Sequence, residues 1–168
     1  HDPQSLYLTF EAKEDGTAPL PSELDGRDWF WAGRDRWYLP RGASNSIMLE
    51  IQPDPSNATR HFSLLVNVSG QCLDAFYGDL DLTNPRDWKS DVRAATTVNE
   101  DGWTGTVAIP WKSLGLRLRA GTQIRANISH WRAGKATTYW SPLPAGWDHA
   151  QRRDCSRERF GIISFLEQ

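Results

Sequence analysis

The chain has 168 residues, and its 19 Lys and Arg against 21 Asp and Glu give a formal net charge of −2. A chain of this length is expected to fold as a single domain, which we place over residues 1–168. The balanced charge argues against nucleic acid as a partner, and no apolar run approaches the roughly 20 residues that cross a bilayer, so we expect no membrane contact.

Most of the chain alternates apolar and polar residues, a period that is typical of strands in a half-buried β-sheet. The first such runs are Leu6–Phe10, Ile47–Ile51 and Phe62–Val66. Later runs, separated by Gly, Asn, Asp or Pro clusters, are Asp91–Val98, Trp103–Ile109, Thr122–Trp131, Ala136–Trp140 and Phe160–Phe165. The one helical signal is a single turn at Pro110–Leu114. The pattern predicts an all-β fold, an antiparallel β-sandwich of two sheets.

Two long segments interrupt this pattern. Residues 13–46 lack alternation but hold an aromatic cluster, Trp29, Phe30, Trp31, Trp37 and Tyr38, and residues 140–160 form a second aromatic and charged segment. A loop of this length in a compact domain is usually functional. The chain has nine tryptophans, and an indole face offers a large, rigid surface for stacking against a sugar ring. We therefore expect a binding site built from these two loops.

The two cysteines, Cys72 and Cys155, have no second cysteine or histidine at the spacing of a zinc site. Their polar flanks leave two readings open, a disulfide in an exported protein or a pair of reduced thiols. The sequence begins with His1 instead of Met, and we expect it to be a processed or excised piece of a longer chain.

Several motifs, taken in chain order, resemble carbohydrate-binding module family 9 and its DOMON-like relatives. They are Asp2–Phe10, Asn45–Pro53, Phe62–Gly70, the Gly-Trp…Ala-Ile-Pro-Trp stretch Gly102–Trp111 with Leu114 and Gly115, Asn127–Trp131, Trp140–Pro142 and Phe160–Gly161. The resemblance covers nearly the whole chain, although the family usually begins with one or two further strands. The resemblance implies the sandwich fold. It also implies that Trp103 and Trp111 of the Gly102–Trp111 motif, the most specific of these motifs, lie in the core.

The resemblance also implies a function, because the family binds sugars without catalysis by clamping a terminal glucose- or xylose-type ring between two tryptophans. We expect Trp37 and Trp147 to form this clamp, followed by Trp140, Trp29 and Trp31 as candidates. Polar ligands for the sugar hydroxyls are expected from Asp35, Arg36, Asn45, His130, Asp148 and Gln151. This chain departs from the family at Met48, where an acidic residue is common, and at His130, where an arginine is common.

The expected partner is a cello- or xylo-oligosaccharide or a polysaccharide chain end, bound in a secreted, extracellular or periplasmic setting. The module would target a parent enzyme, such as a glycoside hydrolase, or a cell-surface protein within a larger multidomain protein. No organic cofactor is expected. Relatives carry calcium in loops, so Asp74, Asp79 and Asp81, in a stretch read as turn-rich, are candidate ligands for a structural calcium ion; a plain solvated loop is the alternative.

Three other functions remain as alternatives. Some DOMON-like relatives bind haem, for which Met48 is a candidate ligand. An N-terminal His1 could hold copper together with His61, His130 or His149, as in oxidative polysaccharide enzymes. A glycosidase needs two carboxylates held across one bond, and no recognisable pairing is present, so hydrolysis has the least support.

Overall fold

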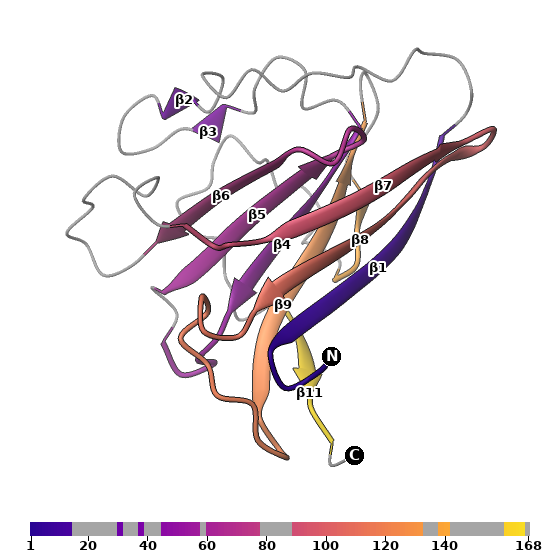
Figure 1. Ribbon diagram of the computed structural model, residues 1–168. Helices are drawn as coiled ribbons and strands as arrows, with labels where there is room; N and C mark the ends of the chain where they lie inside the picture. The colour runs from indigo at the N-terminus through magenta and orange to yellow at the C-terminus, as the bar shows by residue number, and fades with distance from the viewer. Residues whose placement is uncertain are drawn as a thin grey trace.

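The computed structural model describes residues 1–14, 30–31, 37–38, 45–57, 60–77, 89–132, 138–141 and 160–166. Over these ranges the chain forms strands and turns, with no helix. The strands build two antiparallel sheets that pack face to face (Figure 1), which confirms the predicted β-sandwich. None of the described residues forms a helix long and apolar enough to span a membrane.

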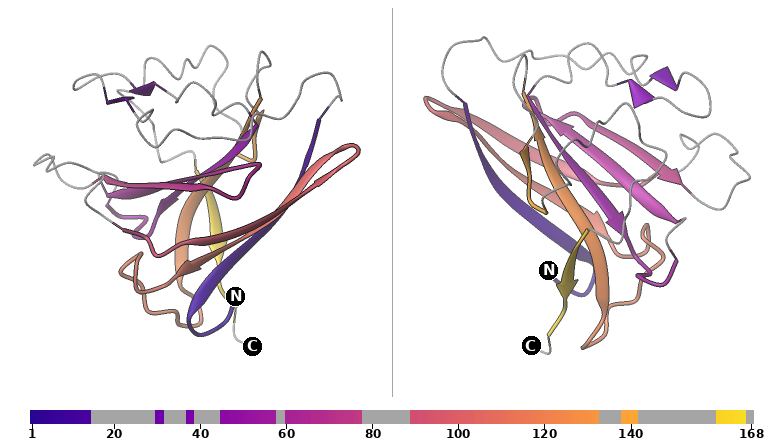
Figure 2. Two further views of the ribbon diagram at one scale, coloured as in Figure 1. Left: turned by 45° about the horizontal axis from the view of Figure 1, so that its top comes forward. Right: turned by 180° about the vertical axis from the view of Figure 1, so that it is seen from behind.

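The smaller sheet has three strands in the order β1-β8-β7. These are β1 (Ser5–Lys13), β7 (Arg93–Asn99) and β8 (Gly102–Pro110). In the right panel of Figure 2 this sheet lies behind the larger one.

The larger sheet has six strands, with the order β10-β9-β4-β5-β6 and β11 also paired with β9. Its strands are β4 (Ser46–Gln52), β5 (His61–Asn67), β6 (Cys72–Tyr77), β9 (Gln123–Trp131), β10 (Thr138–Tyr139) and β11 (Gly161–Ser164). Two further short strands, β2 (Phe30–Trp31) and β3 (Trp37–Tyr38), pair only with each other within the described residues.

The core lies between the two sheets and is formed by the apolar positions of the alternating pattern. Leu49 and Ile51 from β4 pack with Val107 and Ile109 from β8, and Phe62 from β5 joins the same cluster. The two tryptophans of the Gly102–Trp111 motif are buried, Trp103 at 1% exposure and Trp111 at 3%, so the expectation that both are structural is confirmed. The indole N–H of Trp111 donates to the carbonyl of Asp2, 3.0 Å away.

One local expectation was wrong. The stretch containing Asp74 is not a turn, because Cys72–Tyr77 pairs with β5 as a strand. The single turn expected at Pro110–Leu114 is present directly after β8, where the N–H of Ser113 donates to Pro110 and the N–H of Leu114 donates to Trp111. The N–H of Trp111 donates to the carbonyl of Gln4, which ties this segment to the chain just before β1.

Asp74 joins the two sheets at one edge. Its Oδ2 accepts hydrogen bonds from both the N–H and the hydroxyl of Ser90, each 2.7 Å long, and Ser90 lies just before β7. The Ser90 hydroxyl oxygen in turn accepts from the N–H of Val92. A single carboxylate therefore connects β6 of the larger sheet to the chain that enters the smaller sheet.

The strands β4 and β5 differ from the half-buried strands that the sequence predicts. Every residue of both strands is buried, on the face away from the core as well as on the face toward it. Since successive residues point to opposite faces, the second face carries the polar positions of the alternating pattern. Its polar side chains are therefore held in a buried environment.

Candidate functional site

A row of polar side chains crosses the face of the larger sheet that points away from the core. Glu50 in β4 lies directly opposite Ser63 in β5 and Asn127 in β9. Gln52 lies two residues beyond Glu50 in β4, and Ser129 lies two residues beyond Asn127 in β9, so both point to this face. The face also carries other buried residues, Ser46, Met48, Leu65 and Asn67. We call six of its buried polar residues the polar face: Glu50, Gln52, His61, Ser63, Asn127 and Ser129.

Glu50 carries the carboxylate of the polar face among the described residues. Its exposed fraction is 8%, yet within the described part of the chain no hydrogen bond or ion pair reaches its carboxylate. The hydroxyl of Ser63, directly opposite, is buried and has no hydrogen-bond partner among the same residues. Paired positions on neighbouring antiparallel strands place their Cβ atoms about 4.5–5.5 Å apart. An acceptor-only group and a hydroxyl thus lie side by side with their hydrogen-bonding capacity unused.

Burying such groups is costly unless something satisfies them. A buried polar group without a hydrogen bond costs roughly 1–3 kcal/mol on mutational scales, and an unpaired carboxylate costs more. Groups of this kind are concentrated at functional sites. The pair Glu50 and Ser63 is therefore the strongest candidate for direct ligand contact among the described residues.

The other amides on the polar face hold the chain around it. The Nε2 of Gln52 donates to the carbonyls of Asp54, Pro55 and Asn57, which fixes the turn after β4. The side chain of Asn127 donates to the carbonyl of Ser141 and accepts from its N–H, at 3.1 and 3.0 Å. The Gln52 nitrogen and the Asn127 amide are thus engaged and position the surroundings of Glu50 and Ser63, whereas Oε1 of Gln52 is buried without a hydrogen-bond partner among the described residues.

An aromatic residue lies at one end of the same face. Trp131 occupies the outward position of β9 that pairs with Ser46, and its indole N–H donates to the hydroxyl of Ser129 at 2.8 Å. This hydrogen bond fixes the orientation of the indole along the strand. The sequence analysis did not select Trp131, because it closes a predicted strand and lies in neither long loop.

Most residues of the expected tryptophan clamp lie outside the described residues. These are Trp29, Trp147, Asp35, Arg36, Asp148 and Gln151. Trp31 and Trp37 belong to β2 and β3, where their backbones pair with each other; their side chains are not described. The clamp therefore stays a prediction.

His130 lies on the opposite face of the larger sheet from Glu50. It pairs with the core residue Ile47, and its Nε2 lies 3.0 Å from Oε1 of Glu14, which follows β1. Burial lowers the pKa of His130, while the Glu14 carboxylate raises it and offsets part of that effect. The burial effect dominates, so the close contact with Glu14 does not by itself make this histidine a cation at neutral pH.

Asn45 does not lie on the polar face either. It is buried, it has a left-handed backbone with φ of 70°, and its N–H donates to the carbonyl of Trp131. Asparagine tolerates this conformation better than most residues. The position is therefore explained by the turn that leads into β4.

Trp140 stands at the edge of the larger sheet, with 52% of its surface exposed. A Cβ atom placed on Gly161 would lie 2.6 Å from the indole ring, so the ring sits directly against that glycine. Gly161 pairs with the core-facing Ala126, and paired residues share a face. The Trp140 ring thus lies on the core side of the sheet edge, on the opposite face from Glu50.

Of the three candidate calcium ligands, Asp74 is described by the structure, and the other two are not. The Oδ2 of Asp74 is occupied by Ser90, whereas Asp79 and Asp81 lie outside the described residues. Among the residues that the structure describes, no group of three His, Cys, Asp or Glu could hold a metal ion. A calcium site in this region stays a prediction.

The candidate ligands for copper and haem are dispersed. The His1 ring packs edge-on against Trp111 and Phe165, His61 lies on the polar face and His130 on the core side of the sheet, while His149 is outside the described residues. Met48 is buried in β4 with 1% exposure. The described histidines thus lie on different faces of the molecule.

Cys72 lies at the start of β6, half-buried. Its Sγ is 3.6 Å from the carbonyl of Gly70, and burial, with a smaller contribution from Asp74, raises the pKa of its thiol. Its expected disulfide partner, Cys155, lies outside the described residues. The disulfide stays a prediction.

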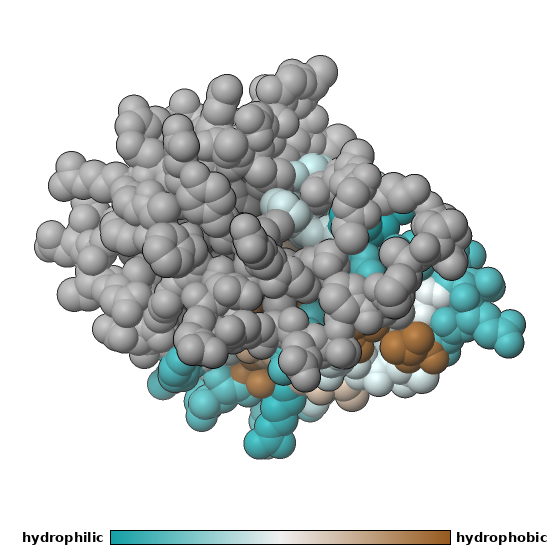
Figure 3. All heavy atoms as spheres, turned by 90° about the horizontal axis from the view of Figure 1, so that it is seen from above, coloured by the Kyte–Doolittle hydropathy of each residue, from teal (hydrophilic) through white to brown (hydrophobic). Residues whose placement is uncertain are grey.

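Glu50 and Ser63 are the residues that sequence reasoning missed. Both occupy polar positions of runs in which the apolar positions form the core, so their outward direction was predictable. The signal that could have selected them is the strongly apolar sequence of the strands that carry them. Apolar runs of this kind are typical of strands that are buried on both faces. In Figure 3, the described residues that are visible from this side are mostly hydrophilic, with a few hydrophobic ones among them.

Comparison with known proteins supports the fold. No family model matches this chain, and no curated protein matches its sequence. Among solved structures, it is similar to a protein from Bacteroides uniformis described as a "putative carbohydrate-binding protein", with a TM-score of 0.62 and 15% identity over 96% of this chain and 73% of the other. At this identity the likeness establishes the shared β-sandwich fold.

Proposed function

We propose that the protein binds carbohydrate without catalysing a reaction, and that the polar face is its binding site. The observation that carries this proposal is the pairing of Glu50, a carboxylate residue with 8% exposure and no hydrogen bond or ion pair to a described residue, with the buried hydroxyl of Ser63, which has no hydrogen-bond partner there. A carboxylate accepts hydrogen bonds from sugar hydroxyls, and a serine hydroxyl both donates and accepts. The fold is shared with a protein whose description names carbohydrate as its ligand, which supports the same class here.

A binding role fits this surface better than hydrolysis. Glycosidases use two carboxylates, about 5–9.5 Å apart, on either side of the scissile bond. Glu50 is the single carboxylate on the polar face among the described residues of β4, β5 and β9. One acceptor beside a hydroxyl is sufficient to hold a pair of sugar hydroxyls.

The finer proposal concerns the sugar and the stacking residues. We propose the chain end of a glucan or xylan as the ligand, with Trp37 and Trp147 supplying the stacking faces. The abundance of tryptophan and the aromatic cluster of residues 29–38 support this choice. Replacing either tryptophan with alanine should weaken binding by one to two decades, since losing a stacking face costs about 1–3 kcal/mol at a binding hot spot.

Calorimetry with cellotriose and xylotriose tests the proposal. Glu50→Gln keeps the shape of the side chain but removes its charge, and it should weaken binding by about tenfold or more, because hydrogen bonds to charged groups contribute about 1.5–3 kcal/mol. The matched control is Glu100→Gln, at the exposed turn between β7 and β8, which should bind as the wild type does. Wild-type affinity in Glu50→Gln, or no binding of either sugar by the wild type, would overturn the proposal.

A further inference from the structure

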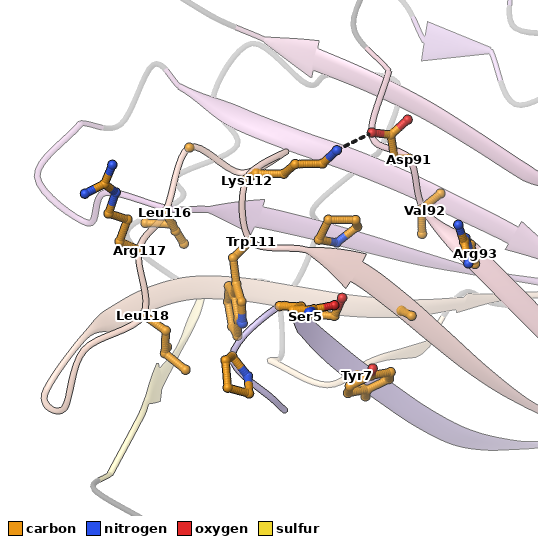
Figure 4. A pocket seen from close by; sticks show the side chains of 15 residues that line it. Ser5, Tyr7, Asp91, Val92, Arg93, Trp111, Lys112, Leu116, Arg117 and Leu118 are labelled. Atoms are coloured by element: carbon orange, nitrogen blue, oxygen red, sulfur yellow. Dashed lines mark ion pairs between the residues drawn. The ribbon is translucent and has the colours of Figure 1, made fainter.

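A separate groove of about 1300 Å³ lies on the outer face of the smaller sheet. Its walls are formed by four neighbouring segments (Figure 4): the chain before β1, the start of β7, the end of β8 and the turns after β8. Every residue that lines it belongs to the described part of the chain. We call it the outer groove, and its position on the smaller sheet makes it independent of the polar face.

The register of the smaller sheet creates a slot at one end of this groove. Ala108 in the central strand pairs with Tyr7 on one side and with Arg93 on the other. Neighbouring strands lie about 4.7–4.9 Å apart, so the Tyr7 and Arg93 backbones are about 9–10 Å apart across a floor formed by a single methyl group. A slot of this width accepts one sugar ring between the aromatic side chain of Tyr7 and the guanidinium of Arg93.

The aromatic wall is held in place. Tyr7 is 45% exposed, and its hydroxyl donates to Oδ2 of Asp2 at 2.8 Å. The other carboxylate oxygen of Asp2 accepts from the N–H groups of Gln4 and Ser5, both at 2.7 Å. Because Asp2 is fixed on two sides, the Tyr7 ring is oriented before any ligand arrives, which lowers the entropic cost of binding.

The groove carries an excess of positive charge in a protein whose net charge is −2. Its charged lining residues are Arg93, Lys112 and Arg117 against the single carboxylate of Asp91, and that carboxylate pairs with Lys112 at 3.2 Å. No ion pair or hydrogen bond reaches the guanidinium of Arg93 or Arg117 from any described residue. Figure 4 shows these two arginines toward opposite ends of the groove.

We propose that the outer groove binds an acidic oligosaccharide, in which a uronic acid ring stacks on Tyr7 and its carboxylate pairs with Arg93. Arginine recognises a carboxylate through two parallel hydrogen bonds, and the C–H face of a pyranose packs on an aromatic ring. Because the second unpaired guanidinium, Arg117, lies toward the other end of the groove, the site matches acid groups on more than one residue of a chain. A single small anion would leave one of the two arginines unused.

Calorimetry with trigalacturonate, using cellotriose as the neutral probe, tests this second site. Arg93→Gln should weaken trigalacturonate binding by about tenfold or more, and Ala108→Leu should abolish it by filling the slot. The matched control is Arg119→Gln, an exposed arginine outside the groove lining, which should bind as the wild type does. Glu50→Gln should also leave trigalacturonate binding unchanged, so failure of the outer-groove proposal can be distinguished from failure of the polar-face proposal.

Three results would overturn the proposal. The first is no binding of trigalacturonate by the wild type at millimolar concentration. The second is an equal effect of Arg93→Gln and Arg119→Gln, which would mean that the sugar responds only to net charge. The third is full displacement of trigalacturonate by equimolar inorganic phosphate, which would assign the groove to simple anions. Thermal melts of each variant show whether a loss of binding reflects a loss of fold.

Discussion

Glu50 and Ser63 project from directly paired positions of β4 and β5 to the same face of the sheet. No described residue forms a hydrogen bond or ion pair with Glu50, which is 8% exposed, and the buried hydroxyl of Ser63 has no hydrogen-bond partner there. Both strands are otherwise typical of a sheet centre, with core residues on their other face. The Ser63 hydroxyl reduces the stability of the free protein, because its burial is not offset by a hydrogen bond. In the proposed site, a sugar hydroxyl would supply this missing partner.

The first prediction separates stability from binding at this position. Glu50→Leu should raise the free energy of unfolding by roughly 1 kcal/mol or more, because an apolar side chain removes a buried unpaired charge. The same variant should lose affinity for neutral oligosaccharides. Urea denaturation and calorimetry measure the two quantities. A variant that is less stable than the wild type would show that the Glu50 carboxylate is satisfied in the free protein.

The second prediction concerns the link between the sheets. Asp74→Asn should destabilise the protein by about 1.5–3 kcal/mol, because the carboxylate of Asp74 accepts two hydrogen bonds from Ser90. The control is Asp91→Asn, which breaks an exposed ion pair with Lys112 and should cost at most about 1 kcal/mol. Equal effects in urea denaturation would argue against the Asp74–Ser90 link as a stabilising contact.

The third prediction follows from the lowered pKa of His130. The folded protein holds His130 neutral at pH values where the unfolded chain, with the ordinary value of 6.5, binds a proton. The contribution of this histidine to stability is therefore constant above pH 6.5 and is lost progressively as the pH falls from 6.5 through the lowered pKa of the folded state. His130→Gln should lose less stability than the wild type between pH 7.5 and 5. Parallel losses in the two proteins would contradict the direction of the shift.

The fourth prediction concerns the packing of the Trp140 ring against Gly161. Gly161→Ala places a methyl group where the indole ring now lies, and it should destabilise the protein by about 1–3 kcal/mol, as overpacking does. In the background of Trp140→Ala the same substitution should cost much less, because the ring that it meets is gone. A double-mutant cycle measures this coupling. Additive effects would mean that the ring does not depend on Gly161 for its position.

The alternation of apolar and polar residues made most of the sheet predictable. A period of two assigns residues to opposite faces, and it placed Ile47, Leu49 and Ile51 together in the core. It could not find β6, because Asp74 occupies a core-side position of that strand, opposite Leu64, where the pattern expects an apolar residue. The reason lies in a tertiary contact, the hydrogen bonds to Ser90, which no local pattern contains.

The candidate site was less predictable than the fold. Alternation indicates that Glu50 and Ser63 point away from the core, but whether that second face is buried depends on distant parts of the chain. The tryptophan count favoured loop aromatics, whereas Trp131 and Tyr139, which lie on the same face as Glu50, are strand residues. Trp140, which was expected beside the sugar, lies on the other face of the sheet because its ring packs on Gly161.

Mapping the bound sugar by backbone amide chemical shifts is the most direct test of the central claim that the polar face binds neutral carbohydrate. Titration of the labelled protein with cellotriose or xylotriose should shift the amides of β4 and β5 around Glu50 and Ser63 in proportion to occupancy. The amides of Tyr7, Arg93 and Ala108 in the outer groove should stay unchanged in the same titration. Shifts confined to the outer groove, or to the edge at Trp140, would contradict the account.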